Sequence, residues 1–363
     1  MFGFLEMSKI NKNIPQLKEN IKKLTLNMKK EWQNMGCVSS KIPDIVGEGY
    51  HLKVKKTVAV GGSAKIMEVD PGGGKEIMIV KKMVAFSKRE EERILQEIDL
   101  YKKLEKNEFV IDLIAHIVEE INHYLLFKRY PINFSEYLEK LKENGTVDEL
   151  KHLKYFSGIV SAIEDLHSFD YAHLDIKPAN IMKSGDEIKM IDFGSATKMP
   201  IEIKTSSDHH KHKEDAEELC SMMYRAPELF NCEIGSTLTT AVDVWALGVC
   251  LYEFMYLENP FNKIYEQGGS IALATQSPHM IKWDEERNVS QKTIDLIKSI
   301  LIVDPTTRPS IVDLRTSVEK LIVNWNHPKE ENEEEAKSQN SQNTDNATRE
   351  ITDEEFDLAM RQN

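Results

Sequence analysis

The stretch that decides the fold is His173-Leu174-Asp175-Ile176-Lys177-Pro178-Ala179-Asn180, which is followed by Asp192-Phe193-Gly194 and then by Ala226-Pro227-Glu228. Any one of these short stretches can occur by chance in an unrelated protein, but all three in this order along one chain form a specific signal. Residues 51–128 alternate apolar and polar side chains as strands do, whereas residues 134–323 repeat apolar side chains with the period of helices. A sheet-rich half followed by a helix-rich half predicts two lobes with a cleft between them.

In this order the three stretches resemble the H-R-D-L-x-x-x-N, D-F-G and A-P-E signatures of the eukaryotic protein kinases. The resemblance covers about residues 45–323. It implies an α+β, bilobal protein-kinase fold, with a small β-rich N-lobe at about 47–128 and a large helical C-lobe at about 129–325. It also implies that ATP is the phosphate donor, that proteins are the substrates, and that Mg²⁺ is the metal, with Mn²⁺ as an alternative.

The resemblance assigns chemistry to four polar residues. Asp175 would orient the acceptor hydroxyl or take its proton, and Lys177 would place its ammonium on the transferring phosphate. Asn180 and Asp192 offer the hard oxygen ligands that Mg²⁺ prefers. An isolated Asp-x-Lys pair is normally a surface ion pair, and the metal-ligand candidates downstream favour the catalytic interpretation here. Lys at this position resembles serine/threonine kinases rather than tyrosine kinases.

The nucleotide site is expected to begin at a turn, Ala59-Val60-Gly61-Gly62-Ser63-Ala64, although a plain hairpin is the competing interpretation. Met78-Ile79-Val80-Lys81 resembles the V-A-I-K strand, whose lysine binds the α- and β-phosphates, and Lys82 is the alternative. Glu97 is the expected ion-pair partner of that lysine. The residues expected around the adenine are Ile79, Phe127, Lys128, Arg129 and Tyr130.

Glu97 belongs to a stretch with helical periodicity. Residues 89–104 are expected to form one helix, because apolar side chains recur on one stripe. The members of this stripe are Ile94, Leu95, Ile98, Tyr101 and Leu104. Two further charged groups resemble structural residues of the family: Asp243, which would brace the catalytic loop, and Arg308, which would pair with Glu228 because buried charges need partners.

Three departures from the family pattern motivate a rival hypothesis. Leu174 replaces the arginine that commonly anchors a phosphorylated activation loop, which argues against switching by loop phosphorylation. Ile79 stands where a small alanine usually roofs the adenine, and Ser63 replaces the usual aromatic residue at the loop tip. The rival is a membrane-tethered pseudokinase scaffold. Because no catalytic polar group is lost, we expect an active enzyme.

Finer details resemble the Numb-associated kinase (NAK) family, and within it the myristoylated and palmitoylated, Golgi-associated serine/threonine kinase branch. The stretch 59–64 is similar to its A-x-G-G-F-A loop, and 192–197 matches its D-F-G-S-A-T. Residues 224–230 and 269–274 look like the corresponding stretches of that branch, and Glu214 to Cys220 looks like its helical activation-segment insert. This resemblance implies a role in Golgi or vesicle traffic.

The composition of the chain argues against several other classes of protein. Lys+Arg 47 against Asp+Glu 60 gives a net charge of −13, which argues against a general nucleic-acid binder. Four dispersed cysteines fit a reducing compartment, and no apolar run approaches the ~20 residues that span a bilayer. His209, His210 and His212 could hold a metal, although three histidines in a solvated loop are the plainer interpretation.

The two ends carry opposite charge. Residues 1–34 form a basic extension, with seven lysines against three glutamates, and residues 326–363 form an acidic, Asn- and Gln-rich tail that we expect to be disordered. Between the extension and the kinase domain, residues 35–46 contain Met35-Gly36-Cys37-Val38-Ser39-Ser40. This fits the myristoylation pattern on Gly36, with Cys37 available for palmitate, if translation begins at Met35. Two acyl chains would anchor the protein on the cytosolic face of Golgi or endosomal membranes.

Overall fold

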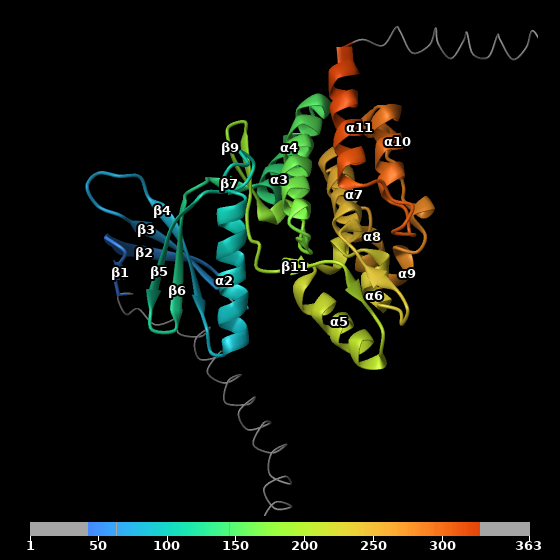
Figure 1. The fold of residues 1–363 in the computed structure, drawn as a ribbon. Coiled ribbons are helices and arrows are strands. Elements are labelled where there is room, and N and C mark those ends of the chain that lie inside the picture. Colours follow the sequence, from blue (N-terminus) through green and yellow to red (C-terminus); the bar gives the residue numbers. More distant parts are fainter. Residues whose placement is uncertain (1–42, 63, 145, 327–363) are drawn as a thin grey trace, which may run out of the picture. The chain divides into compact units, whose positions relative to one another are not determined.

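The computed structural model describes residues 43–62, 64–144 and 146–326 (Figure 1). Ser63, Gly36, Cys37, the basic extension and nearly all of the acidic tail therefore lie outside the described residues. Both lobes belong to one compact unit that ends at Val318. In the described part of the chain, no helix is long and apolar enough to cross a membrane.

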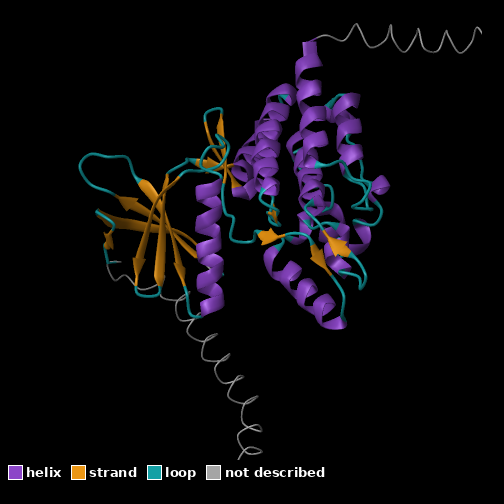
Figure 2. Cartoon of the chain, viewed as in Figure 1, coloured by secondary structure: helices purple, strands orange, loops and turns teal. Residues whose placement is uncertain are grey.

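The N-lobe is one antiparallel sheet with a helix beside it, as the sequence predicts (Figure 2). The strand order is β1-β2-β3-β4-β6-β5. One side of the sheet buries a cluster of apolar side chains that includes Leu52, Val69, Val80 and Leu126. The elements are β1 (Ile45–Gly47), β2 (Tyr50–Val60), β3 (Ala64–Asp70), β4 (Met78–Val84), α2 (Lys88–Lys103), β5 (Leu113–Glu119) and β6 (Asn122–Lys128).

The turn between β3 and β4 depends on glycine. Gly72, Gly73 and Gly74 all have φ between 66° and 74°, a region that side chains with a Cβ seldom enter. The backbone N–H of Gly72 donates to Asp70 Oδ1 at 2.9 Å and closes the turn. The two strands that it joins pair in register from Ala64 with Met83 to Val69 with Met78.

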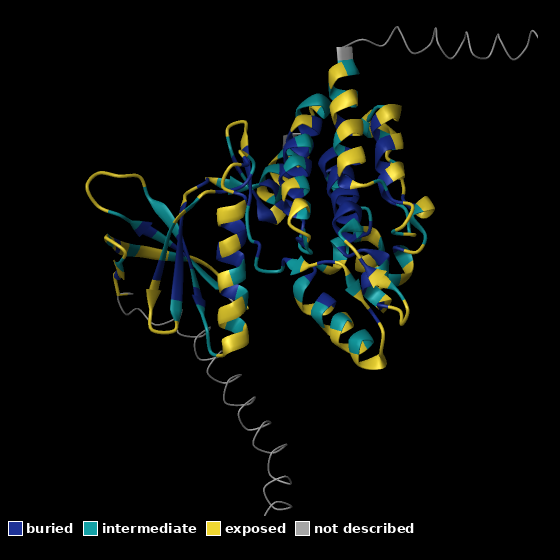
Figure 3. Ribbon diagram, in the orientation of Figure 1, coloured by how far each residue is buried: buried dark blue, intermediate teal, exposed yellow. Residues whose placement is uncertain are grey.

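Helix α2 begins at the N-cap Ser87, whose side chain accepts from Glu90 N, and it buries one face against the sheet (Figure 3). The expected helix is therefore confirmed to within one residue at each end. One member of its apolar stripe is wrong, because Leu95 is 46% exposed whereas Leu100 is fully buried. A step of one residue turns a helix by about 100°, which carries Leu95 away from Ile94 and toward solvent.

The C-lobe is mostly helical, and α7 is its most buried element (Figure 3). Short strands accompany the helices, in one three-stranded sheet of order β10-β9-β7 and in the pairs β11-β8 and β12-β13. The helices are α3 (Phe134–Asn144), α4 (Glu149–Ser168), α5 (Ser206–Leu219), α6 (Pro227–Asn231), α7 (Ala241–Tyr256), α8 (Asn262–Glu266), α9 (Ile271–Ala274), α10 (Gln291–Ile300) and α11 (Ile311–Val323). The strands are β7 (Ile132–Asn133), β8 (Tyr171–Ala172), β9 (Ile181–Ser184), β10 (Glu187–Met190), β11 (Thr197–Lys198), β12 (Ile201–Glu202) and β13 (Thr237–Leu238). Single 3₁₀ turns are η2 (Pro178–Asn180), η3 (Met222–Tyr224), η4 (Pro278–Met280), η5 (Glu285–Arg287) and η6 (Asn324–Asn326).

Two buried charges organise the C-lobe, and both expectations about them are confirmed. The Asp243 carboxylate accepts from the backbone N–H groups of His173 at 2.6 Å and Leu174 at 2.9 Å, so that α7 holds the catalytic loop. Arg308 makes a two-bonded pair with Glu228, with both N–O distances at 2.7 Å. It also donates to three backbone carbonyls, which satisfies a buried guanidinium.

We predict that Arg308→Ala lowers the free energy of unfolding by about 3–5 kcal/mol, because it leaves Glu228 as an uncompensated, largely buried carboxylate. Denaturant unfolding followed by tryptophan fluorescence measures this loss. Lys142→Ala is the matched control, since Lys142 pairs with Glu139 in an exposed i,i+3 contact worth about 0.5 kcal/mol or less. Equal losses for the two variants would contradict a structural role for the Arg308 pair.

Candidate active site

Lys81 projects from the middle of β4 into two carboxylates. Its Nζ lies 2.7 Å from Glu97 Oε1 on α2 and 2.7 Å from Asp192 Oδ1, which follows β10 in the C-lobe. The Glu97 side chain is 2% exposed, so its charge depends on this one cation. The contact joins the sheet, α2 and the C-lobe at a single ammonium group.

The surroundings of Lys81 shift the pKa of all three groups. Burial alone would lower the pKa of Lys81, but the Asp192 and Glu97 carboxylates reverse this and raise it. The nearby Lys81 cation holds the pKa of Asp192 at about 2, against the opposing effect of burial. Burial raises the pKa of Glu97, and Lys81 opposes that rise. Lys81 and Asp192 therefore stay charged across the physiological range.

The alternative lysine occupies a different environment. Lys82 lies on the opposite side of β4, where its Nζ is 5.3 Å from the centre of the Tyr124 ring. Burial, followed by the charge of Lys65, lowers the pKa of Lys82. Geometry thus favours Lys81 over Lys82 as the lysine of the site.

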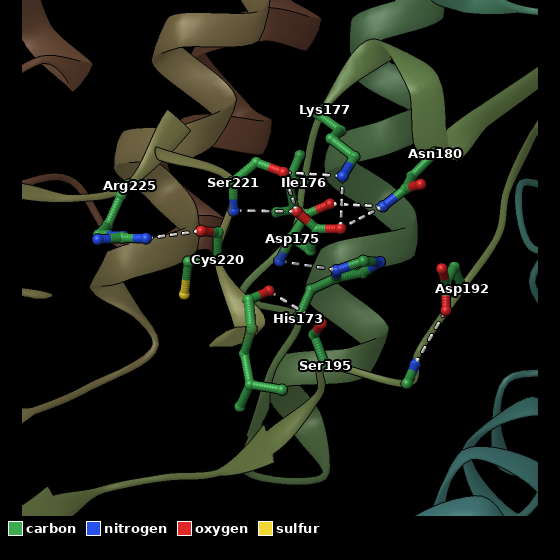
Figure 4. Close-up of polar contacts among 12 residues, drawn as sticks. His173, Asp175, Ile176, Lys177, Asn180, Asp192, Ser195, Cys220, Ser221 and Arg225 are labelled. Carbon is green, nitrogen blue, oxygen red and sulfur yellow. Dashed lines mark hydrogen bonds and ion pairs between the residues drawn. The ribbon is translucent and has the colours of Figure 1, made fainter. Parts of the chain in front are cut away.

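The catalytic-loop residues cluster around Asp175 (Figure 4). Lys177 Nζ donates to Asp175 Oδ2 at 2.8 Å. The Asn180 amide nitrogen donates to the same oxygen at 2.9 Å and to the Asp175 carbonyl at 2.8 Å. Because the amide nitrogen makes these two bonds, the Asn180 amide oxygen remains for another partner.

Ser221 completes the cluster, and the sequence analysis does not single it out. Its hydroxyl donates to Asp175 Oδ1 at 2.6 Å, its backbone N–H donates to the same atom at 3.2 Å, and it accepts from Lys177 Nζ at 2.7 Å (Figure 4). The only sequence signal is a hydroxyl residue shortly before Ala226-Pro227-Glu228. Its contact with Asp175 spans 46 residues, which no local pattern encodes.

The Asp192-Phe193-Gly194 stretch is held in a restricted conformation. Asp192 has φ of 67°, which is uncommon for a residue with a side chain, and its backbone N–H donates to Tyr101 Oη at 2.9 Å. A Cβ on Gly194 would lie 3.2 Å from both Asp192 Oδ1 and Glu97 Oε2. Glycine at this position therefore lets the carboxylates approach Lys81.

One cavity of about 630 Å³ brings together the expected phosphate-side and catalytic residues except Asn180, which is not in its lining. Its lining includes Gly62, Lys81, Glu97, Asp175, Lys177 and Asp192. The expected adenine-side residues do not line this cavity. Phe127 and Tyr130 are buried, Ile79 pairs with Phe127 across β4 and β6, and Lys128 and Arg129 are exposed. Ala59 and Val60 are exposed at the end of β2, and the Gly61 N–H donates to the Ala64 carbonyl at 2.8 Å.

The donor set suits a divalent cation between phosphates. Asn180 offers its amide oxygen, and the Asp192 side chain is 44% exposed although Oδ1 accepts from Lys81. Among the described residues, this site included, no three His, Cys, Asp or Glu side chains are grouped to hold a metal. The three histidines do not lie in a loop, because α5 begins at Ser206, earlier than the expected Glu214. His209 and His210 hydrogen-bond to the carbonyls of Cys232 and Ser206.

The opposite pKa shifts of the two lysines predict opposite reactivity toward an amine-acylating reagent. A lowered pKa gives Lys82 more free amine at a given pH, whereas a raised pKa keeps Lys81 protonated and unreactive through pH 10. Tandem mass spectrometry after brief labelling between pH 7 and 10 measures both sites, with the exposed Lys88 as a reference. Labelling of Lys81 as fast as that of Lys82 would contradict the ion-pair geometry.

Comparison with known proteins agrees with this geometry. The family described as "Protein kinase domain" matches residues 52–318. The chain is 30% identical over 295 residues to Serine/threonine-protein kinase 16 of Rattus norvegicus and to that of Homo sapiens, covering 78% of this chain and 94% of each relative. It is 25% identical over 308 residues to Serine/threonine-protein kinase ppk13 of Schizosaccharomyces pombe, covering 74% of this chain and 89% of the relative. The chain therefore belongs to the protein kinase family, as a serine/threonine protein kinase that uses ATP and a divalent metal.

Proposed function

We propose that this enzyme transfers the γ-phosphate of ATP to protein serine and threonine hydroxyls with Mg²⁺, and that Asp175 is its catalytic carboxylate. The observation that supports this most is the position of Asp175, which Lys177, Asn180 and Ser221 hold beside the cavity that contains the Lys81 and Asp192 pair. Such fixed geometry suits phosphoryl transfer, where positioning and charge neutralisation do most of the work.

Each residue has one role in this proposal. Lys81, kept charged by Asp192 and Glu97, binds the phosphates, and Asn180 and Asp192 hold the metal. Bound metal and nucleotide supply the phosphoryl group and offset its charge. Asp175 orients the acceptor hydroxyl and takes its proton. Lys177, which already bridges Asp175 and Ser221, lies where it can neutralise the transferred group.

The pseudokinase alternative has weaker support. Leu174 makes its essential contact through its backbone, because its N–H donates to Asp243 Oδ1, so the missing arginine does not displace the catalytic loop. Ile79 lies on β4 outside the lining of the 630 Å³ cavity, so it does not obstruct the phosphate side of the site where Lys81 and Asp192 meet. A thermal shift with Mg·ATP would separate the alternatives, since a nucleotide that binds the native state stabilises it.

We predict that Asp175→Asn lowers phosphate transfer from labelled ATP by about 10²–10⁴-fold, because the amide cannot take the hydroxyl proton. Casein serves as acceptor, and phosphoamino-acid analysis should find label on serine or threonine. The matched control is Asp186→Asn, the same chemical change at an exposed carboxylate that pairs with Lys151. It should leave the rate unchanged.

Label confined to tyrosine would contradict the choice of acceptor. Equal rates for Asp175→Asn and the unmodified chain would contradict the role of Asp175 and favour the scaffold.

We also propose that the enzyme belongs to the Golgi-associated branch of the Numb-associated kinases and is anchored through Gly36 and Cys37. The proposed organisation is a basic extension at 1–34, an acylated segment at 35–46, a kinase domain at 47–325 and an acidic tail at 326–363. Support comes from the M-G-C-V-S-S sequence directly before the kinase lobe.

We predict that protein made in a cell with the acyl transferase lacks residues 1–35 and carries a myristoyl group on Gly36, because the transferase modifies only an N-terminal glycine. Intact mass spectrometry measures both changes, and Gly36→Ala should abolish the added mass. A product that begins at Met1 would contradict the anchoring proposal.

A further inference from the structure

The hydroxyl of Tyr101 is a buried polar group beside the phosphate side of the active site. Tyr101 lies in α2 four residues after Glu97, so the two side chains share one face of the helix. The residue is 3% exposed, and its Oη accepts the backbone N–H of Asp192 at 2.9 Å. Within the described part of the chain, this is the only hydrogen bond that the Asp192 N–H donates. Periodicity places Tyr101 in the apolar stripe of α2 and says nothing about its hydroxyl.

Two aromatic neighbours fix the position of this hydroxyl. The centre of the Tyr101 ring is 5.2 Å from that of Phe127 and 5.1 Å from that of Phe193, which it meets edge to face at 86°. Both phenylalanines are buried, so the ring has little freedom to turn. Aromatic packing needs no polar atom, and a phenylalanine in place of Tyr101 would preserve it. The effect of the hydroxyl can therefore be separated from that of the ring.

Asp192 is held both at its side chain and at its backbone. Its Oδ1 accepts from Lys81 Nζ at 2.7 Å. The same oxygen accepts from the Gly194 N–H at 3.3 Å (Figure 4). The Asp192 backbone has φ of 67°, which is uncommon for a residue with a side chain, and its N–H reaches Tyr101 in this conformation. The Tyr101 hydrogen bond thus stabilises the backbone geometry from which the carboxylate reaches Lys81.

The two anchors of Asp192 respond differently to a bound nucleotide. In the proposed function Lys81 binds the phosphates, so its ammonium group is then shared between the phosphates and Asp192. Tyr101 is not in the lining of the 630 Å³ cavity, and its hydroxyl does not compete for the phosphates. The Tyr101 hydrogen bond is therefore the contact that continues to hold Asp192 when the site fills.

We propose that Tyr101 is a positioning residue for the metal, whose hydroxyl holds the backbone of Asp192 so that the carboxylate is oriented for Mg²⁺ before nucleotide binds. The inference rests on the proposed function, because that function assigns Asp192 as a metal ligand. Without the hydroxyl, the Asp192 N–H loses its acceptor and the backbone can relax from its restricted conformation. Restoring that conformation then costs part of the binding free energy of the metal.

The experiment measures how much Mg²⁺ tightens nucleotide binding in the full chain. A fluorescent ATP analogue is titrated once with Mg²⁺ and once with EDTA, and the ratio of the two Kd values is the Mg²⁺ effect. Tyr101→Phe should reduce the Mg²⁺ effect about tenfold, the equivalent of about 1.4 kcal/mol. The Kd in EDTA should change by less than about twofold, because the contact between Lys81 and Glu97 is unaltered.

Tyr124→Phe is the matched control. It removes a hydroxyl from a tyrosine of the N-lobe that is 5% exposed and bonds Glu119 at 3.1 Å instead of the active site. This variant should leave the Mg²⁺ effect unchanged. Both variants lose one hydrogen bond in the same lobe, so a difference between them cannot come from a general loss of stability.

Hydrogen–deuterium exchange provides a second, direct measurement at Asp192. In the unmodified chain the Asp192 N–H should exchange slowly, because it donates to a buried oxygen. In Tyr101→Phe this amide should exchange about tenfold faster, and in Tyr124→Phe it should not change. Mass spectrometry of a peptide that contains Asp192 measures these rates.

A reduced Mg²⁺ effect and faster exchange at Asp192, both confined to Tyr101→Phe, support the inference. An unchanged Mg²⁺ effect with a lower unfolding midpoint, an equal loss in Tyr124→Phe, or free exchange of the Asp192 N–H in the unmodified chain would overturn it while leaving the proposed function intact. An unmodified chain whose affinity for ATP does not depend on Mg²⁺ would instead overturn the proposed function, and the inference with it.

Discussion

The structure depends on one ammonium group held between two carboxylates from different lobes. Glu97 is too deeply buried to carry a charge without Lys81, and Lys81 is too deeply buried to carry one without Glu97 and Asp192. The charges of Glu97 and Lys81 therefore depend on each other, and Asp192 adds a second carboxylate to the same ammonium group. This mutual requirement fixes β4, α2 and the start of the activation segment relative to one another, and it fixes where phosphates can bind.

A second set of contacts fixes the acceptor side. Asp243, buried in α7, positions the catalytic loop through backbone N–H groups, which explains why Leu174 can replace a charged residue there without loss of geometry. Ser221 then orients Asp175 from the far end of the activation segment. Helix α5 ends shortly before Ser221, and its carboxylates Asp215 and Glu218 contact Arg93 on α2. The activation segment therefore contacts both the catalytic loop and α2.

The sequence predicts the parts of this arrangement that follow from local spacing. The two lobes and the helix that carries Glu97 follow from periodicity, and resemblance to kinase signatures indicates Asp175, Asn180 and Asp192. Periodicity could not decide between Lys81 and Lys82, because only the partners across the cleft distinguish the two. Local patterns do not indicate Ser221 for a similar reason, since its partner Asp175 lies 46 residues away in the chain. The length of α5 was also underestimated, because polar residues fill its first turns and its start depends on the Thr205 and Asp208 capping box.

The most direct test of the central ion pair is a single-turnover measurement of phosphate transfer at saturating ATP in Glu97→Gln and Glu92→Gln. Both variants remove one negative charge from α2, but only Glu97 contacts Lys81, whereas Glu92 is exposed and pairs with Lys88. The account predicts at least a tenfold slower step in Glu97→Gln, about 1.4 kcal/mol of lost transition-state stabilisation, and an unchanged step in Glu92→Gln. Equal rates in the two variants would contradict the claim that the buried pair organises the site.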